Sequence, residues 1–133
     1  MIVDAGIYEL QAAFATRLAE FDPAVLREKS GNEPFLRCWL VPADEAVSGL
    51  GSSAPIEAVG FYQVDCNIPI DQGEGLLWKM ADAVAKHFKV GSSVSYQDFV
   101  AIVTRTTRSG IIAADPGWQR VSVRTYYMAH FRR

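Results

Sequence analysis

Hydrophobic and polar side chains alternate along Gly60–Ile68, a period of two that is typical of a β-strand with one buried face. The row that we expect to meet the core consists of Tyr62, Val64, Cys66 and Ile68. The opposite row, which we expect to face water or another subunit, consists of Phe61, Gln63, Asp65 and Asn67. Pro69 ends this strand, because proline has no N–H group to donate to a neighbouring strand.

Two other segments have hydrophobic residues spaced three or four apart, the pattern of an α-helix with one buried face. The first spans Asp4–Phe21 and the second about Gln72–Phe88. Asp71 can accept hydrogen bonds from free backbone N–H groups, and Glu74 follows three residues later. This spacing predicts a capping box at the start of the second helix.

Three further segments alternate as strands do, and one long segment has no period at all. The additional predicted strands are Phe35–Val41, Val94–Thr104 and Arg120–Phe131. Arg105–Ala114 is either a strand extension or a hairpin tip broken at Gly110. Ala43–Pro55 contains two glycines and three serines, which predicts a long mobile loop between two antiparallel strands.

The predicted elements follow the order helix, strand, long loop, strand, helix, strand, turn and strand. Strands joined by hairpins, with helices on one side, are typical of an α+β fold. We therefore predict a single domain over residues 1–133. It would be a two-layer sandwich in which two helices pack on one face of a mostly antiparallel sheet of four strands, or slightly more.

Composition narrows the possible partners. The chain has 133 residues, enough to form a hydrophobic core without disulfides or metal ions, and its formal net charge is −2. This charge gives no general attraction to nucleic acid or to anionic membranes. The sequence lacks an apolar run long enough to span a membrane and a signal-peptide pattern, so we expect the protein in the cytoplasm. Cys38 and Cys66, both in predicted strands, are expected to be small buried hydrophobes.

The sequence carries no recognised catalytic motif. It has no dinucleotide-binding GxGxxG, no phosphate-binding P-loop and no nucleophile elbow GxSxG. His87 and His130 are far apart in sequence and lie beside no nucleophile in a motif, so we interpret them as a helix-end cation and a surface residue. We expect no enzyme activity, no cofactor and no metal site.

Arginine is concentrated in the last third of the chain, whereas acidic residues dominate the first two thirds. The clustered arginines are Arg105, Arg108, Arg120, Arg124, Arg132 and Arg133. Such asymmetry of charge favours surfaces that dock on one another or on a charged partner. An equally open interpretation is a strand face that is simply solvated.

The order of segments resembles the phage and prophage tail terminator family, of which the lambda-type tail terminator is the best-known member. The resemblance rests on EPFLRCWLVPAD, GFYQVDCNIPIDQGEG, a helix ending in VAKHF, and DPGWQRVSVRTYY, and it covers about residues 4–127. Within it, the residues most similar to the family are Gly60, Gln63, Val64, Asp65, Pro69, Ala81, Asp82, Phe88, Gly117 and Trp118.

The resemblance implies a structural role without catalysis. Members form a ring, typically a hexamer, that caps the tail tube, stops its polymerisation and offers the surface on which the head docks. The implied partners are further copies of this chain, the tail-tube protein and the head–tail connector protein. DNA would only pass through the lumen, without sequence-specific binding. The implied location is the host bacterial cytoplasm during assembly and then the virion tail.

In the family, the long loop between the first two strands lies on the tube-facing or lumenal side of the ring. The corresponding segment here is Ala43–Pro55, with Asp44 and Glu45. The candidate residues for subunit or tube contact are therefore Asp44, Glu45, Arg105, Arg108, Arg120 and Arg124.

Two alternatives stay open. The chain could be another head–tail connector, neck or tail-completion protein, since these share small α+β folds. It could also be a small-ligand-binding module or an enzyme with a pocket between the helices and the sheet. The tryptophans that could line such a pocket are Trp39, Trp78 and Trp118.

Overall fold

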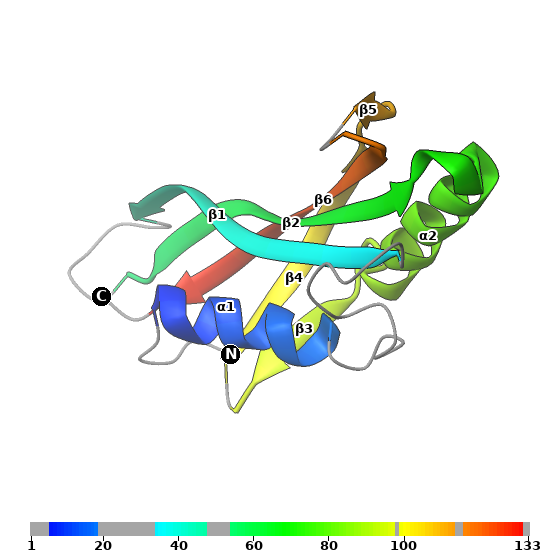
Figure 1. Ribbon diagram of the computed structural model, residues 1–133. Helices are drawn as coiled ribbons and strands as arrows, with labels where there is room; N and C mark the ends of the chain where they lie inside the picture. The colour runs from blue at the N-terminus through cyan, green and yellow to red at the C-terminus, as the bar shows by residue number, and fades with distance from the viewer. Residues whose placement is uncertain (1–5, 19–33, 48–53, 98, 114–115, 132–133) are drawn as a thin grey trace.

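The computed structural model describes residues 6–18, 34–47, 54–97, 99–113 and 116–131. Two α-helices and six strands make up this part of the chain (Figure 1). The helices are α1 (Ile7–Leu18) and α2 (Glu74–His87), and a short 3₁₀ turn, η1 (Ile70–Gln72), precedes α2. The strands are β1 (Phe35–Val47), β2 (Ile56–Pro69), β3 (Ser93–Tyr96), β4 (Phe99–Arg108), β5 (Ile112–Ala113) and β6 (Trp118–Phe131).

The strands form one antiparallel sheet in the order β1-β2-β6-β4-β3, with β5 paired to β6 beside this path. The chain is broadly α+β, but the prediction of a four-stranded sheet is wrong, because the sheet has six strands and curls (Figure 1). The segment predicted as one strand from Val94 divides into β3 and β4. The chain turns between them at Gln97, whose φ of 54° lies in the left-handed region.

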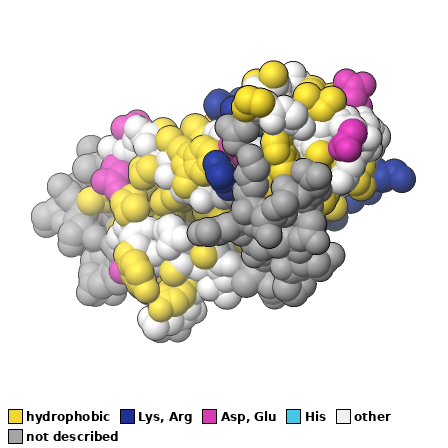
Figure 2. Space-filling view, in the orientation of Figure 1, with side chains coloured by type: hydrophobic (Ala, Val, Ile, Leu, Met, Phe, Trp, Pro, Cys, Tyr) yellow, Lys and Arg dark blue, Asp and Glu magenta, His cyan; other side chains and the backbone are white. Residues whose placement is uncertain are grey.

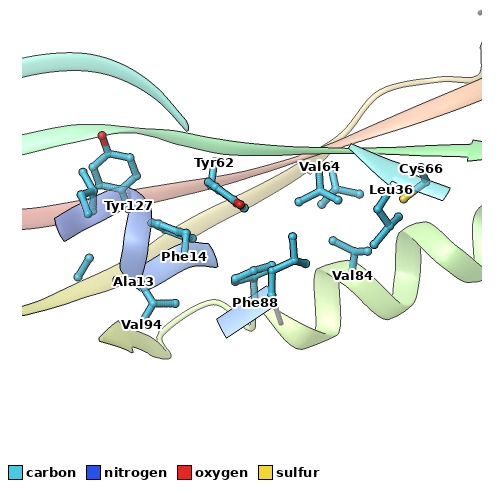
Figure 3. Close-up of a cluster of buried hydrophobic side chains, with 14 of the residues drawn as sticks. Ala13, Phe14, Leu36, Tyr62, Val64, Cys66, Val84, Phe88, Val94 and Tyr127 are labelled. Atoms are coloured by element: carbon cyan, nitrogen blue, oxygen red, sulfur yellow. The ribbon is translucent and has the colours of Figure 1, made fainter. Parts of the chain in front are cut away.

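Both helices contribute to one core, on the same face of the sheet. The predicted hydrophobic row of β2 is buried there, as are the odd-numbered residues of β6 that stand beside it. Figure 3 shows Phe14 of α1 and Val84 of α2 pointing toward the sheet side chains. The Phe14 ring stacks on Tyr62 with 4.9 Å between ring centroids, and it lies 5.8 Å from the ring of Phe88. Packing of this kind ties the two helices to the centre of the sheet.

The curl of the sheet follows from two bulges at neighbouring levels. Pro42, Gly60, Tyr127 and Val103 form a row across four strands. The register of β1 shifts between Pro42 and Asp44, and that of β4 shifts between Val103 and Arg105. Each bulge therefore follows the row directly, on either side of the central pair β2 and β6. Bulges bend the strand that carries them, so the sheet bends along this row.

Two local predictions need correction. The residues from Ala43 to Val47 continue β1 beyond its bulge, so the predicted loop at 43–55 does not begin at Ala43; its middle, 48–53, lies outside the described residues. The predicted capping box is also wrong. Asp71 lies in the 3₁₀ turn, and α2 begins after Gly73, whose φ is 83°, with no side-chain cap.

Candidate assembly surface

The face of the sheet opposite the helices, which we name the outer face, carries most of the charged side chains that are predicted to contact other subunits or the tube. Alternation along four strands places them there, because paired residues in antiparallel strands point to the same side. The outer face includes Arg37, Trp39, Asp44, Glu57, Phe61, Gln63, Asp65, Asn67, Arg105, Thr107, Arg120, Ser122, Arg124 and Tyr126.

Arginine side chains lie over aromatic rings in the middle of the outer face. The guanidinium carbon of Arg105 is 4.1 Å from the ring centroid of Tyr126, and that of Arg124 is 4.9 Å from the centroid of Phe61. The two rings contact one another, with centroids 5.4 Å apart. A guanidinium over a ring face is held by cation–π attraction, so these two arginines are oriented while their charge stays at the surface.

A chain of hydrogen bonds continues from Arg124 toward the buried end of the outer face. Arg124 Nε donates to Gln63 Oε1 at 3.1 Å, and Gln63 Nε2 donates to Asp65 Oδ1 at 2.9 Å. The Ser122 hydroxyl donates to the same Asp65 oxygen at 2.6 Å, and Arg120 lies 3.9 Å from Asp65 Oδ2. Asp65 is only 3% exposed, so the carboxylate depends on these partners to balance its lost hydration.

The middle of the outer face has a positive electrostatic character. In its middle the one described carboxylate, on Asp65, is buried, whereas Arg105 and Arg124 are exposed. Two other carboxylates of the outer face lie toward one end: Asp44 is exposed and Glu57 is half-buried.

The ionisation of Tyr126 reflects the positive environment in the middle of the outer face. Slight burial raises the pKa of Tyr126, but a hydrogen bond with Thr107 and the neighbouring guanidinium groups outweigh it and lower that pKa below its usual value. The middle of the outer face therefore favours a partner with negative charge.

A second positive region lies on the helix side of the sheet. A groove of about 530 Å³ runs between the end of α2 and β4. Its lining residues are Ala85, Lys86, Lys89, Val90, Thr106 and Arg108. Arg108 is paired across the groove with Asp82 of α2, at 3.2 Å between Nη2 and Oδ1. Lys86 and Lys89 are exposed.

Hydrophobic side chains are exposed around the start of α2. Figure 2 shows them gathered over the end of the molecule where α2 lies. Ile70 is 55% exposed, Leu76 42% and Trp78 39%. Exposed hydrophobic residues that lie close together are often covered by another protein.

The six candidate contact residues fall into three places. Arg105, Arg120 and Arg124 come together on the outer face. Arg108 does not join them, because its pairing with Val123 turns it to the helix side. Asp44 and Glu45 lie at the far end of β1, exposed and next to each other in sequence, so they point to opposite faces.

Several residues of the outer face were missed as site residues. Phe61 belongs to the predicted polar row and Tyr126 to a predicted strand, but nothing in the alternation indicates that arginines lie over their rings. Ser122 likewise lies in a predicted strand, and the alternation does not indicate its partner. It meets Asp65 only because β2 and β6 pair across 57 residues of sequence. The signal that would have found the cluster is the register between these two strands.

The tryptophans and cysteines are dispersed. Trp39 is 42% exposed on the outer face, and Trp118 packs edge-on against Phe35 with centroids 5.3 Å apart; neither lines the groove. Cys66 is buried as predicted, but the prediction for Cys38 is wrong, since it is exposed near the sheet edge. Within the described residues, no three metal-binding side chains come together, and no helix has the length and hydrophobicity to cross a membrane.

Arginine and aromatic side chains are enriched where proteins bind proteins, so the outer face has the composition of a docking surface. A family model described as phage tail terminator protein matches residues 2–127. The chain therefore belongs to the phage tail terminator family. It is a structural phage tail protein, and this family implies interaction with other tail components.

Comparison with solved structures supports the fold. Four solved chains match this one. One of them superposes with a TM-score of 0.68 at 19% sequence identity, covering 89% of this chain and 91% of that chain. No curated protein matched the sequence.

Proposed function

We propose that this protein closes into a ring on the end of the tail tube, stops tube polymerisation there and offers the surface on which the head docks. Its partners are further copies of itself, the tail-tube protein and the head–tail connector. Assembly takes place in the host cytoplasm. The observation that carries the proposal is the family match over residues 2–127. The exposed, oriented arginines of the outer face add a surface suited to docking.

We assign the outer face to contact with the tube. Arg105 and Arg124 present positive charge on a rigid sheet, and their positions are fixed by the rings beneath them. A pre-oriented side chain loses little conformational freedom when it binds, which favours affinity. The matching surface on the tube end would carry carboxylates that these guanidinium groups can bind in a bidentate manner.

The ring is tested by native mass spectrometry of the purified protein, followed by negative-stain microscopy with and without assembled tail tubes. The expected result is a closed six-membered ring, either free or bound at one end of each tube. A strict dimer under every condition, with bare tube ends, contradicts the proposal. Tubes that keep growing in the presence of the protein also contradict it.

The tube-facing role of the outer face is tested by Arg124→Glu. We expect this variant to form rings of wild-type mass and to bind tube ends at least roughly tenfold more weakly, because a repulsive charge replaces an attractive one. Lys79→Glu is the matched control: it makes the same change of charge on the exposed side of α2. If both variants bind tubes like the wild type, the outer face does not contact the tube.

A further inference from the structure

We propose that the subunits of the ring join edge to edge, with β1 of one copy adding to the sheet of the next copy beside β4. This inference rests on the ring proposed above and names the surfaces that make it. The occupant of each sheet edge is a second copy of this chain. Main-chain hydrogen bonds would provide the affinity, and side chains on the two faces would provide the specificity.

The two edges are available in the described part of the chain. β1 pairs with β2 on one side, and no described strand pairs with its other side. β3 covers β4 only from Phe99 to Ile102, and two loop hydrogen bonds reach Val103, so no described strand covers Arg105–Arg108. Uncovered backbone N–H and C=O groups at a sheet edge are a template for pairing with another chain.

The charges at these edges match on each face separately. On the outer face, Asp44 stands at the β1 edge and Arg105 at the β4 edge. On the helix side, Glu45 stands at the β1 edge, and it is close enough to buried Tyr127 to help raise the pKa of that phenol. Lys86 and Lys89 line the groove beside β4 on that same side. A sheet continued from copy to copy keeps its faces aligned. Asp44 would then meet Arg105 on the outer face. Glu45 would meet Lys86 and Lys89 on the helix side, so both contacts join opposite charges.

The strand directions also fit. Each neighbouring pair in the order β1-β2-β6-β4 is antiparallel, so β1 and β4 run in opposite directions. When a ring repeats this order, β1 of the next copy is antiparallel to β4. Asp44 stands level with Ile102 across the sheet, through Val59 and Met128, so it reaches Arg105 only if the pairing is staggered. Closing a sheet requires tilted strands and such a stagger.

The opposite signs of the two edges decide which assemblies form. Charges on an edge strand commonly prevent unwanted pairing. Here a contact that brings Asp44 and Glu45 of two β1 edges together is repulsive, and so is one that brings the cations of two β4 edges together. Both effects oppose a two-fold dimer through these segments. Only the unlike pair is attractive, and contacts between unlike surfaces generate a ring when the rotation closes.

The test uses two charge-reversed variants of the full chain. One carries Asp44→Lys with Glu45→Lys, and the other carries Lys89→Glu with Arg105→Glu. In each variant the β1 edge and the β4 edge carry charges of the same sign. Each variant alone should therefore show no rings in native mass spectrometry, and its self-association should weaken at least roughly tenfold. Mixed in equal amounts, the two should form rings again, with the variants alternating and three of each in a six-membered ring.

The mixing experiment separates the possible failures. Rings restored by mixing exclude misfolding as the reason for their loss, and circular dichroism of each variant provides a second check. Asp71→Lys with Glu74→Lys is the matched control, because it reverses two exposed acids away from both edges. Edge pairing is overturned if either variant alone still forms rings like the wild type, or if mixing the two variants does not restore rings. Either result leaves the proposal of a ring itself in place. A wild-type protein that forms no ring even on tube ends overturns both.

Discussion

The hydroxyl group of Tyr127 occupies the space above Gly60 in which any other residue would place its side chain. A Cβ atom at Gly60 would lie 2.7 Å from the Tyr127 hydroxyl oxygen and 2.6 Å from the carbonyl oxygen of Val41. The two residues pair directly between β2 and β6, in the row where the sheet bends. Absence of a side chain at Gly60 therefore allows the backbone of β1 and the ring of Tyr127 to approach β2 closely.

Replacing Gly60 by alanine should destabilise the fold. Because the backbone of Val41 cannot move away as a flexible side chain does, we expect the free energy of unfolding to fall by about 1–3 kcal/mol. Urea denaturation followed by circular dichroism measures the loss. Gly75→Ala is the control, because a Cβ there meets nothing within 4 Å. In α2 the extra methyl group should leave stability unchanged or raise it by up to about 1 kcal/mol. Equal stability of both variants would show that the close approach does not matter.

Removing the Tyr127 hydroxyl should cost almost nothing. The hydroxyl oxygen is buried without a hydrogen-bond partner in the described chain. Deleting an unsatisfied buried polar group is close to neutral or stabilising, so we expect Tyr127→Phe to change the free energy of unfolding by less than about 1 kcal/mol. The same change should also reduce the penalty of Gly60→Ala, since one of its two close contacts disappears. A double-mutant cycle of urea denaturation curves measures this coupling.

The regular part of the fold could be predicted from sequence because its periods are local. The buried row from Tyr62 to Ile68 needed only period-two alternation, and the buried stripe of α2 needed only its spacing. The division of Val94–Thr104 into β3 and β4 could not be predicted in this way. It depends on Gln97 adopting a positive φ, which a residue other than glycine rarely does and which no turn motif announces.

The candidate surface was only partly predictable, because it depends on pairing across distant strands. Alternation placed Asp65 on the polar row of β2, and polar rows usually face water. The structure buries this carboxylate because Ser122 and Arg120 reach it from β6. The register between two strands more than 50 residues apart is set by the whole core and the turns. The same limit explains why Arg108 was grouped with Arg105 and Arg124.

Truncating Asp65 should destabilise the protein markedly. Asp65→Ala leaves the Ser122 hydroxyl and the Gln63 amide without their acceptor, and Arg120 without its nearby charge. We expect the free energy of unfolding to fall by about 2–4 kcal/mol. Thermal and urea denaturation measure it. Asp82→Ala removes an exposed carboxylate paired with Arg108, so it should cost no more than about 1 kcal/mol. Similar losses from both variants would contradict the role given to burial.

The two cysteines should react with thiol reagents at very different rates. Cys38 is exposed, whereas Cys66 is fully buried, and burial, with a smaller contribution from Asp65, raises the pKa of its thiol to about 12. The thiolate is the reactive form, so Cys66 stays inert in the folded protein. Iodoacetamide followed by mass spectrometry should label only Cys38 at neutral pH and both residues in urea. Rapid native labelling of Cys66 would show that the core between β2 and α2 opens readily.

Alkaline pH should unfold the protein because its core holds neutral groups that can ionise. Burial raises the pKa of Cys66 from 9.0 to about 12 and that of Tyr127 from 10.0 to about 12, the latter with help from Glu45. Burial, with a hydrogen bond to Cys38, also raises the pKa of Tyr62. In each case the folded state holds its proton at a pH where the unfolded state has lost it. Stability is therefore fully present below about pH 9 and declines as the pH rises toward 12.

The unfolded pKa values of these groups differ, so the pH at which stability begins to fall identifies the group responsible. Each group lowers the free energy of unfolding by at most about 1.4 kcal/mol per pH unit between its unfolded and folded pKa values. Cys66 has the lower unfolded pKa, so it alone among these three groups accounts for the decline between about pH 9 and 10. In Cys66→Ala, urea denaturation at a series of pH values should show the decline starting nearer pH 10, from a lower plateau. An unchanged onset would mean that the thiol of Cys66 does not control alkaline stability.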